Sequence, residues 1–93
     1  MELSFTWDPR KDAANQRKHR VSFAEARTAF EDVLSITVPD PGHSNDESRF
    51  VLVGRSRRGR LLVVAHAENR DEIRIISARP ATRRERHAYE EEA

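Results

Sequence analysis

The 93-residue sequence has 37% hydrophobic and 35% charged residues and a formal net charge of +1. This composition supports a sheet with a few helices rather than a disordered chain, and the length suits a single domain over residues 1–93. The sequence has no cysteine, which excludes disulfides and thiolate metal sites, and no apolar run long enough for a membrane span or a signal peptide, so we expect a cytoplasmic protein.

A short strand and a first helix are predicted at the start of the chain. The segment from Leu3 to Trp7 alternates between apolar and polar side chains and includes aromatic residues, which indicates a strand. Asp8-Pro9 follows it. Aspartate is a favoured N-cap and proline is favoured at the first helical position, so a helix is expected over residues 9–19. Its apolar face is weak, which places this helix on the surface, with Trp7 in the core at its start.

A second helix begins with a clear capping signal. The segment SFAE at residues 22–25 fits a capping box, in which the first and last side chains each bind the other residue's backbone N–H. Phe23, Ala26 and Phe30 form a helical stripe that is expected to face a sheet. A strand is then predicted over residues 34–38, where apolar and polar side chains alternate.

The second half of the chain predicts three strands and a final helix. A polar loop over residues 39–48 comes first. Strands are then expected over residues 49–55, 60–68 and 72–79. The turns between them are short and force antiparallel pairing. Pro80 ends the last strand, and a second capping box, from Thr82 to Glu85, begins a helix that extends to about residue 92. The prediction is an α+β fold: an antiparallel sheet with two N-terminal helices and one C-terminal helix.

Three sequence motifs follow one another along nearly the whole chain. The first is Phe5-x-Trp7-Asp8-x-x-Lys11-x-x-x-Asn15-x-x-Lys18-His19-x-Val21-x-Phe23-x-Glu25-Ala26, the second is Arg49…Gly54-x-Ser56-x-x-Gly59-Arg60-x-Leu62-x-Val64, and the third is Arg74-Ile75-Ile76-Ser77-Ala78-Arg79-x-Ala81-x-x-x-Glu85-x-x-x-Tyr89. Together they resemble the BrnT family of toxins. Arg20 departs from the pattern, because many members have glycine there, and this bears on the turn after the first helix.

The resemblance implies a fold akin to that of RelE-type ribonuclease toxins. It also implies RNA cleavage that arrests growth, and neutralisation by a BrnA-like antitoxin with a ribbon-helix-helix DNA-binding domain. The toxin–antitoxin complex would repress its own operon, so operator DNA would be contacted only through the antitoxin. No cofactor is implied.

The residues themselves favour a phosphate-binding protein. Residues 51–79 carry seven arginines and only three acidic side chains, and guanidinium groups bind phosphate oxygens in pairs. RNA cleavage without a metal uses the ribose 2′-hydroxyl as nucleophile and needs a base, an acid, and cations that stabilise the charge on the phosphate. Arginine supplies the cations, whereas the acid and the base are ambiguous. Arginine-rich domains also occur for solubility alone, so composition by itself leaves the RNA partner open.

Arg79 is the main candidate for a catalytic phosphate contact. It ends a strand just before a helix, where a phosphate would also meet the backbone amides of residues 81–83, and Arg83 is expected to contact the RNA. The alternative is that Arg79 pairs with Glu85. Arg74 is a second catalytic candidate, with a surface salt bridge as its alternative. It should lie on the opposite face of the strand from Arg79 unless a bulge or twist intervenes, because 74 and 79 differ by an odd number.

Two further groups of candidates lie elsewhere in the sequence. Lys18 and His19 end the first helix, where the helix dipole favours positive charge, so they are candidates for a phosphate clamp and a general acid; helix capping is the alternative. Arg60, His66 and Glu68 share one face of a predicted strand and are candidates for RNA contact. His66 and Glu68 would form an acid–base pair, or would merely be solvated if their strand lies at the edge of the sheet.

Two alternative functions stay open. In the first, the sheet and its arginines only hold a protein or a nucleic acid, and the lack of a convincing general base favours this non-catalytic binding module. A metal-dependent nuclease is less favoured, because the carboxylates are scattered and the histidines lack ligand spacing. No metal site is therefore expected.

Overall fold

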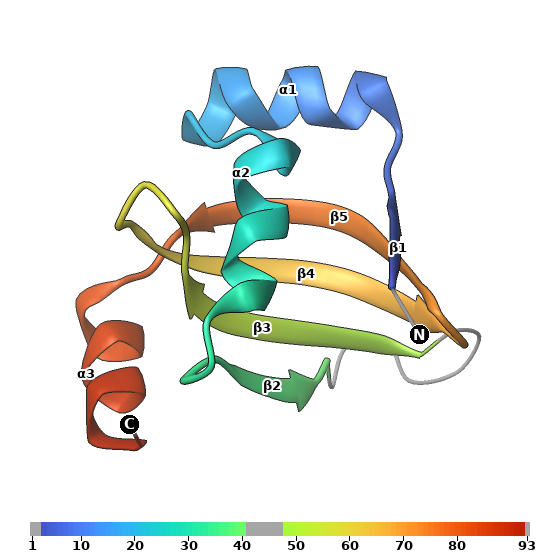
Figure 1. Cartoon of the computed structure of the whole chain (residues 1–93). Helices are drawn as coiled ribbons and strands as arrows, with labels where there is room; N and C mark the ends of the chain where they lie inside the picture. Colours follow the sequence, from blue (N-terminus) through green and yellow to red (C-terminus); the bar gives the residue numbers. More distant parts are fainter. Residues whose placement is uncertain (1–2, 41–47, 93) are drawn as a thin grey trace.

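Figure 1 shows the computed structural model, which describes residues 3–40 and 48–92. It is a mixed α+β fold with a five-stranded sheet in the order β1-β5-β4-β3-β2. Its elements are β1 (Ser4–Thr6), α1 (Pro9–His19), α2 (Phe23–Thr28), the 3₁₀ helix η1 (Ala29–Glu31), β2 (Ile36–Pro39), β3 (Arg49–Arg55), β4 (Leu61–Asn69), β5 (Glu72–Pro80) and α3 (Arg83–Glu92). Most of the loop predicted over residues 39–48 lies outside the described residues. In the described part, no helix has the length and apolar content that a membrane span requires.

β1 joins the sheet in a direction that the sequence did not predict. The strands from β2 to β5 form antiparallel pairs in succession, and the turns after β3 and β4 are short, as expected. β1 instead pairs parallel with β5, with Phe5 opposite Ile73. The prediction of a wholly antiparallel sheet is therefore wrong at β1, because no short turn joins β1 to its neighbour and constrains its direction.

β2 begins at Ile36, later than predicted. The carboxylate of Asp32 accepts a hydrogen bond from the Leu34 N–H at 2.9 Å, and the Ser35 N–H donates to the Asp32 carbonyl at 3.0 Å. Aspartate commonly holds a turn in this way, by bonding the backbone two residues later. The alternating residues 34 and 35 are therefore part of a turn, and strand pairing starts after them.

The two predicted capping boxes differ in the structure. At the start of α3, Thr82 Oγ1 accepts from the Glu85 N–H at 3.2 Å and Glu85 Oε1 accepts from the Thr82 N–H at 2.9 Å, so this box is confirmed. At the start of α2, Ser22 Oγ accepts from the Glu25 N–H at 3.0 Å, but the Glu25 carboxylate turns towards the β3–β4 turn. Only half of this box forms, because charged arginine donors bind a carboxylate more strongly than a backbone N–H does.

α2 crosses one face of the sheet, and α1 runs beside β5 at the edge of the sheet (Figure 1). Phe23 and Ala26 of α2 are fully buried and pack with Leu62 and Val64 of β4 in the hydrophobic core. The apolar stripe predicted for this helix therefore faces the sheet. Trp7 packs edge-on against Phe23, with 6.2 Å between the ring centroids, which confirms its place at the core.

Asn15 is a buried polar residue that ties α1 to β5. Its side-chain amide donates to the carbonyls of Val21 and Ala78, each at 2.8 Å, and its Oδ1 accepts from the Ala78 N–H at 3.1 Å. β1 pairs only with residues 72–74 of β5. Asn15 therefore completes the backbone hydrogen bonding of β5 where β1 does not reach, and it anchors the last turns of α1 beside the end of that strand.

Gly54 in β3 has no room for a side chain. A Cβ atom there would lie 2.8 Å from the Ala29 carbonyl oxygen and 3.1 Å from Ser35 Cβ. Replacing Gly54 by alanine should lower the free energy of unfolding by about 1–3 kcal/mol, because η1 would have to move off the sheet. Urea denaturation measures the loss, and the exposed Ser77→Ala should change stability by less than about 0.5 kcal/mol. Equal stability of Gly54→Ala and the unaltered chain would contradict the close contact.

Candidate functional site

Four segments with basic side chains meet at one end of the sheet (Figure 1). They are the end of α1, the turn between β3 and β4, the end of β5 and the start of α3. The predicted site residues at this end are Lys18, His19, Arg60, Arg79 and Arg83. Three predicted site residues lie nearer the opposite end of the sheet, where β4 ends and β5 begins: His66, Glu68 and Arg74. The structure therefore divides the predicted site into two groups.

Glu25 of α2 is a buried acid that holds the β3–β4 turn, and its side chain is only 5% exposed. It accepts hydrogen bonds from Ser56 Oγ at 2.7 Å and from Arg60 Nε at 3.0 Å, with a further bond from Arg60 Nη2. Arg58 Nη1 lies 3.5 Å from the same carboxylate. The hydrogen bonds from Arg60 above all keep the pKa of Glu25 below its ordinary value, against the opposing effect of burial. Glu25 is thus an ionised anchor for the turn.

Arg60, predicted to contact RNA, is bound mainly to the protein. Besides its bonds to Glu25, its Nη2 donates to the Arg20 carbonyl at 3.0 Å. Within the described chain only its Nη1 group is left for another ligand. Sequence reasoning missed Glu25, because the capping box already explained that residue. The available signal was the run of arginines over residues 55–60, which has no acidic neighbour in sequence and needs carboxylates from elsewhere.

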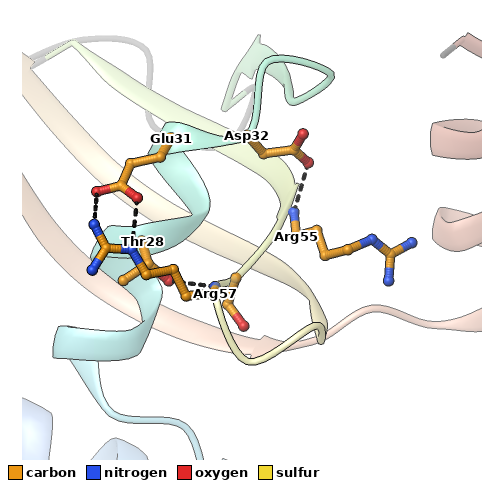
Figure 2. A pocket seen from close by; sticks show the side chains of 6 residues that line it. Thr28, Glu31, Asp32, Arg55 and Arg57 are labelled. Carbon is orange, nitrogen blue, oxygen red and sulfur yellow. Dashed lines mark hydrogen bonds and ion pairs between the residues drawn. The ribbon is translucent and has the colours of Figure 1, made fainter.

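An open pocket of about 290 Å³ lies beside this turn (Figure 2). It is lined by Thr28, Glu31, Asp32, Arg55, Ser56 and Arg57. Glu31 binds Arg57 Nε at 3.0 Å and Nη2 at 3.1 Å. Asp32 accepts from the Arg55 N–H at 2.8 Å and from the Tyr89 hydroxyl at 2.6 Å, and this last bond raises the pKa of Tyr89. Figure 2 shows the Arg55 guanidinium pointing away from the cluster. Both carboxylates of the pocket are therefore already bonded within the protein.

Arg79 forms a bidentate ion pair with Glu85 in the first turn of α3. Its Nη1 donates to Oε1 and its Nη2 to Oε2, each at 2.8 Å, and the Arg79 side chain is 40% exposed. Hydrogen bonding to Arg79 lowers the pKa of Glu85 from its ordinary 4.5 to about 2, with a smaller contribution from the Thr82 N–H. The pairing that the sequence left open as an alternative is therefore present, while the Arg79 side chain still reaches solvent.

The backbone amides before α3 are less available than predicted. The Ala81 N–H donates to the Leu61 carbonyl at 2.9 Å, and the Thr82 N–H donates to Glu85. A phosphate beside Arg79 would not meet these two amides, so that part of the prediction is wrong. Arg83, at the first position of α3, has an exposed side chain.

His66 and Glu68 form the predicted pair, but on the central strand rather than at an edge of the sheet, and only His66 is buried. His66 Nε2 lies 2.9 Å from Glu68 Oε2. His66 is 0% exposed, and its ring packs against Phe30 and Phe50. β4 is the central strand of the sheet, which the sequence did not predict. His66 therefore cannot contact RNA directly in this structure, whereas Glu68 reaches the surface.

A bulge in β5 changes the faces on which its arginines lie. Ile76 has no partner in the register between β4 and β5, so β5 contains one extra residue. Ile75 and Ala78 both belong to the core beneath α2, so their neighbours Arg74 and Arg79 share the opposite face. In a strand without the bulge, strict alternation would put these two arginines on opposite faces. Their partners on β4, Ala67 and Val63, are four residues apart, so the two arginines lie about 13 Å apart along the strand at about 3.3 Å per residue, and each would contact a different phosphate.

Lys18 and His19 lie in the last turn of α1. His19 follows Asn15 by one helical turn and so faces β5, and it is half-buried, whereas Lys18 is exposed. Arg79 extends from β5 towards Glu85 of α3. The end of β5 therefore connects the two candidates, because α1 with His19 packs beside this strand and Arg79 belongs to it.

The ionised carboxylates at this end are poor general bases. An efficient general base has a pKa near the working pH, whereas arginine partners hold the pKa values of Glu25 and Glu85 low. Over residues 3–40 and 48–92, no three histidine, aspartate or glutamate side chains gather as metal ligands would. Chemically, this end presents guanidinium groups oriented by buried or half-buried acids, an arrangement that suits phosphate binding.

Comparison with known proteins points to one family. A family model described as the ribonuclease toxin, BrnT, of type II toxin–antitoxin systems matches residues 7–85. The chain is also similar to the 1.1 Å crystal structure of the Brucella abortus ribonuclease toxin BrnT, with a TM-score of 0.68 and 19% identity over 87% of this chain and 99% of that one. At this identity the structural match shows a shared fold. A search of curated proteins finds no significant match.

Proposed function

Because this chain belongs to the BrnT family of ribonuclease toxins of type II toxin–antitoxin systems, we propose that it cleaves RNA without a metal ion. The nucleophile in this proposal is the ribose 2′-hydroxyl, which attacks the adjacent phosphate. The observation that carries the proposal is Arg79, whose guanidinium is held by Glu85 and is still exposed at the arginine-rich end of the sheet.

Attack by the 2′-hydroxyl needs three contributions: removal of its proton, protonation of the leaving 5′-oxygen, and stabilisation of the charge on the phosphate. Arg79 supplies the third, and the exposed Lys18 and Arg83 bind neighbouring phosphates. His19 is our candidate for proton transfer, because an imidazole ring can both donate and accept a proton. RNA would then lie across the end of β5. Arg74 would contact a more distant phosphate.

The hydrogen bonds of the carboxylates at this end of the sheet support a mechanism without a metal ion. Glu25 and Glu85 bind arginines, Glu31 binds Arg57, and Asp32 accepts from Tyr89. Each of these carboxylates is committed to the protein, and none is directed with another towards a shared cation. Two-metal nucleases use the opposite arrangement, in which carboxylates converge on the ions.

The antitoxin in this proposal is a BrnA-like protein with a ribbon-helix-helix domain, and operator DNA is reached only through it. Burial of the arginine-rich end by the antitoxin would explain neutralisation, since phosphate and antitoxin carboxylates compete for the same guanidinium groups. We also place the toxin in the cytoplasm, where its RNA substrate is, and relate its fold to that of the RelE-type toxins.

The proposal is tested by incubating purified protein with single-stranded RNA in excess EDTA. We expect cleavage, with products that carry 2′,3′-cyclic phosphate and 5′-hydroxyl ends. A substrate with deoxyribose at the cleaved position should resist, because it lacks the nucleophile. Cleavage only after addition of a divalent metal would overturn the mechanism. Binding of RNA without strand scission at any protein concentration would favour the alternative, a non-catalytic binding module.

A further inference from the structure

The guanidinium of Arg79 has one donor edge that the protein leaves open. Arginine carries five N–H donors in a single plane. Nη1 donates to Glu85 Oε1 at 2.8 Å and to the Pro80 carbonyl at 3.3 Å, and Nη2 donates to Glu85 Oε2 at 2.8 Å. The Nε–H and the second N–H of Nη2 remain, and the described chain provides no acceptor for them. These two donors lie side by side on one edge of the plane.

We propose that Glu85 is a positioning residue. It binds the Nη1/Nη2 edge of the Arg79 guanidinium and so orients the Nε/Nη2 edge towards one phosphate of the RNA. This inference rests on the proposed function, because it takes Arg79 as the phosphate contact. Two parallel N–H donors match two oxygens of a phosphate, which is the bidentate geometry that arginine favours. The 40% exposure of the Arg79 side chain gives that edge access to a ligand.

Glu85 is itself held in place by the start of α3. Its Oε1 accepts from the Thr82 N–H at 2.9 Å, and its backbone N–H donates to Thr82 Oγ1 at 3.2 Å. Further along α3, Tyr89 is anchored to Asp32. The Thr82 N–H is a backbone group, so it holds the carboxylate as a support for the long, flexible arginine whichever side chain residue 82 carries, whereas Thr82 Oγ1 only caps the helix. With a pKa lowered to about 2, this carboxylate stays ionised at any pH where the protein would meet RNA.

Removal of Glu85 should have two opposite effects, one on the binding of RNA and one on the rate of its cleavage. The loss of a negative charge beside the phosphate favours binding, whereas the loss of orientation leaves the guanidinium free to rotate. The first effect acts on bound substrate and transition state alike. The second acts mainly on the transition state, where a group displaced by about 1 Å can cost up to about 100-fold in rate. The positioning role therefore predicts a fall in kcat, with KM unchanged or slightly lower.

Glu85→Ala should lower the kcat of RNA cleavage by about tenfold or more, with KM within about threefold of the unaltered chain. Glu85→Gln, which keeps one acceptor oxygen towards Arg79, should recover part of kcat. The matched control is Thr82→Ala, which removes the other half of the same capping box but leaves the Arg79–Glu85 pair. It should keep kcat near that of the unaltered chain while losing a comparable amount of thermal stability.

Each other result counts against the positioning role. A rise in kcat in Glu85→Ala would show that Glu85 competes with the phosphate. Equal losses in Glu85→Ala and Thr82→Ala would show that only helix stability matters, and an unchanged kcat would show no role. Arg79→Ala separates the two proposals: full activity in that variant overturns Arg79 as the phosphate contact, whereas an inactive Arg79→Ala beside a normal Glu85→Ala overturns the role of Glu85 alone.

Discussion

Replacement of Arg79 by alanine should lower kcat/KM for RNA cleavage by about 100-fold or more while the fold persists. Removal of a single preorganised donor to a developing oxyanion costs about 100- to 1000-fold in comparable sites, and Arg79 offers two donors and a full positive charge. The stability loss should be small, because the Arg79–Glu85 pair is partly exposed, at 40% and 30%, and such pairs contribute little. Initial cleavage rates and thermal unfolding measure the two effects.

Two further variants test whether the planar guanidinium of Arg79, rather than positive charge in this region alone, supports cleavage. Arg79→Lys keeps the charge but lacks the planar fork, so its rate should stay at least about tenfold below that of the unaltered chain. Arg86→Ala removes an exposed positive charge from the same helix, and its rate should change by less than about threefold, since solvent and salt screen that charge. A full rate in Arg79→Ala would move the phosphate site away from the end of β5.

Features with a local cause in the sequence were predicted well. The Asp8-Pro9 start of α1 and the Thr82–Glu85 box of α3 are present, because a cap depends only on residues within one turn. The strands from β3 to β5 follow from alternation and short turns. The pair of His66 and Glu68 also follows from alternation, since side chains two apart on a strand share a face.

Features that depend on distant contacts were not predictable from spacing alone. The direction of β1 is set by its pairing with β5, more than sixty residues later in the chain. The extra residue in β5 moves Arg74 to the face of Arg79, and nothing in the local sequence announces the bulge. The burial of His66 depends on the central place of β4 in the sheet. For the candidate site, the sequence therefore predicted Arg79 as a candidate and its pairing with Glu85 as an alternative, but not how the strands arrange its neighbours.

Replacement of Glu25 by alanine should lower the free energy of unfolding by about 2–3 kcal/mol, the largest stability effect that we expect from a single charged residue here. The change leaves the buried hydroxyl of Ser56 without its acceptor and removes the partner of Arg60. Because Arg60 is one-third exposed, its charge can turn to water, so the loss should stay below that of a fully buried pair. Urea denaturation near neutral pH, where Glu25 is ionised, measures the change.

Glu31→Ala is the matched control, because Glu31 also binds an arginine of the β3–β4 turn through two hydrogen bonds. Its pair with Arg57 is exposed, at 52% and 74%, and should contribute less than about 0.5 kcal/mol. The two glutamates link neighbouring helical segments to one turn with the same chemistry, and they differ mainly in burial. Equal losses in the two variants would show that burial does not strengthen the Glu25 anchor. A loss confined to Glu25→Ala would show that one buried carboxylate holds the arginine-rich turn on the fold.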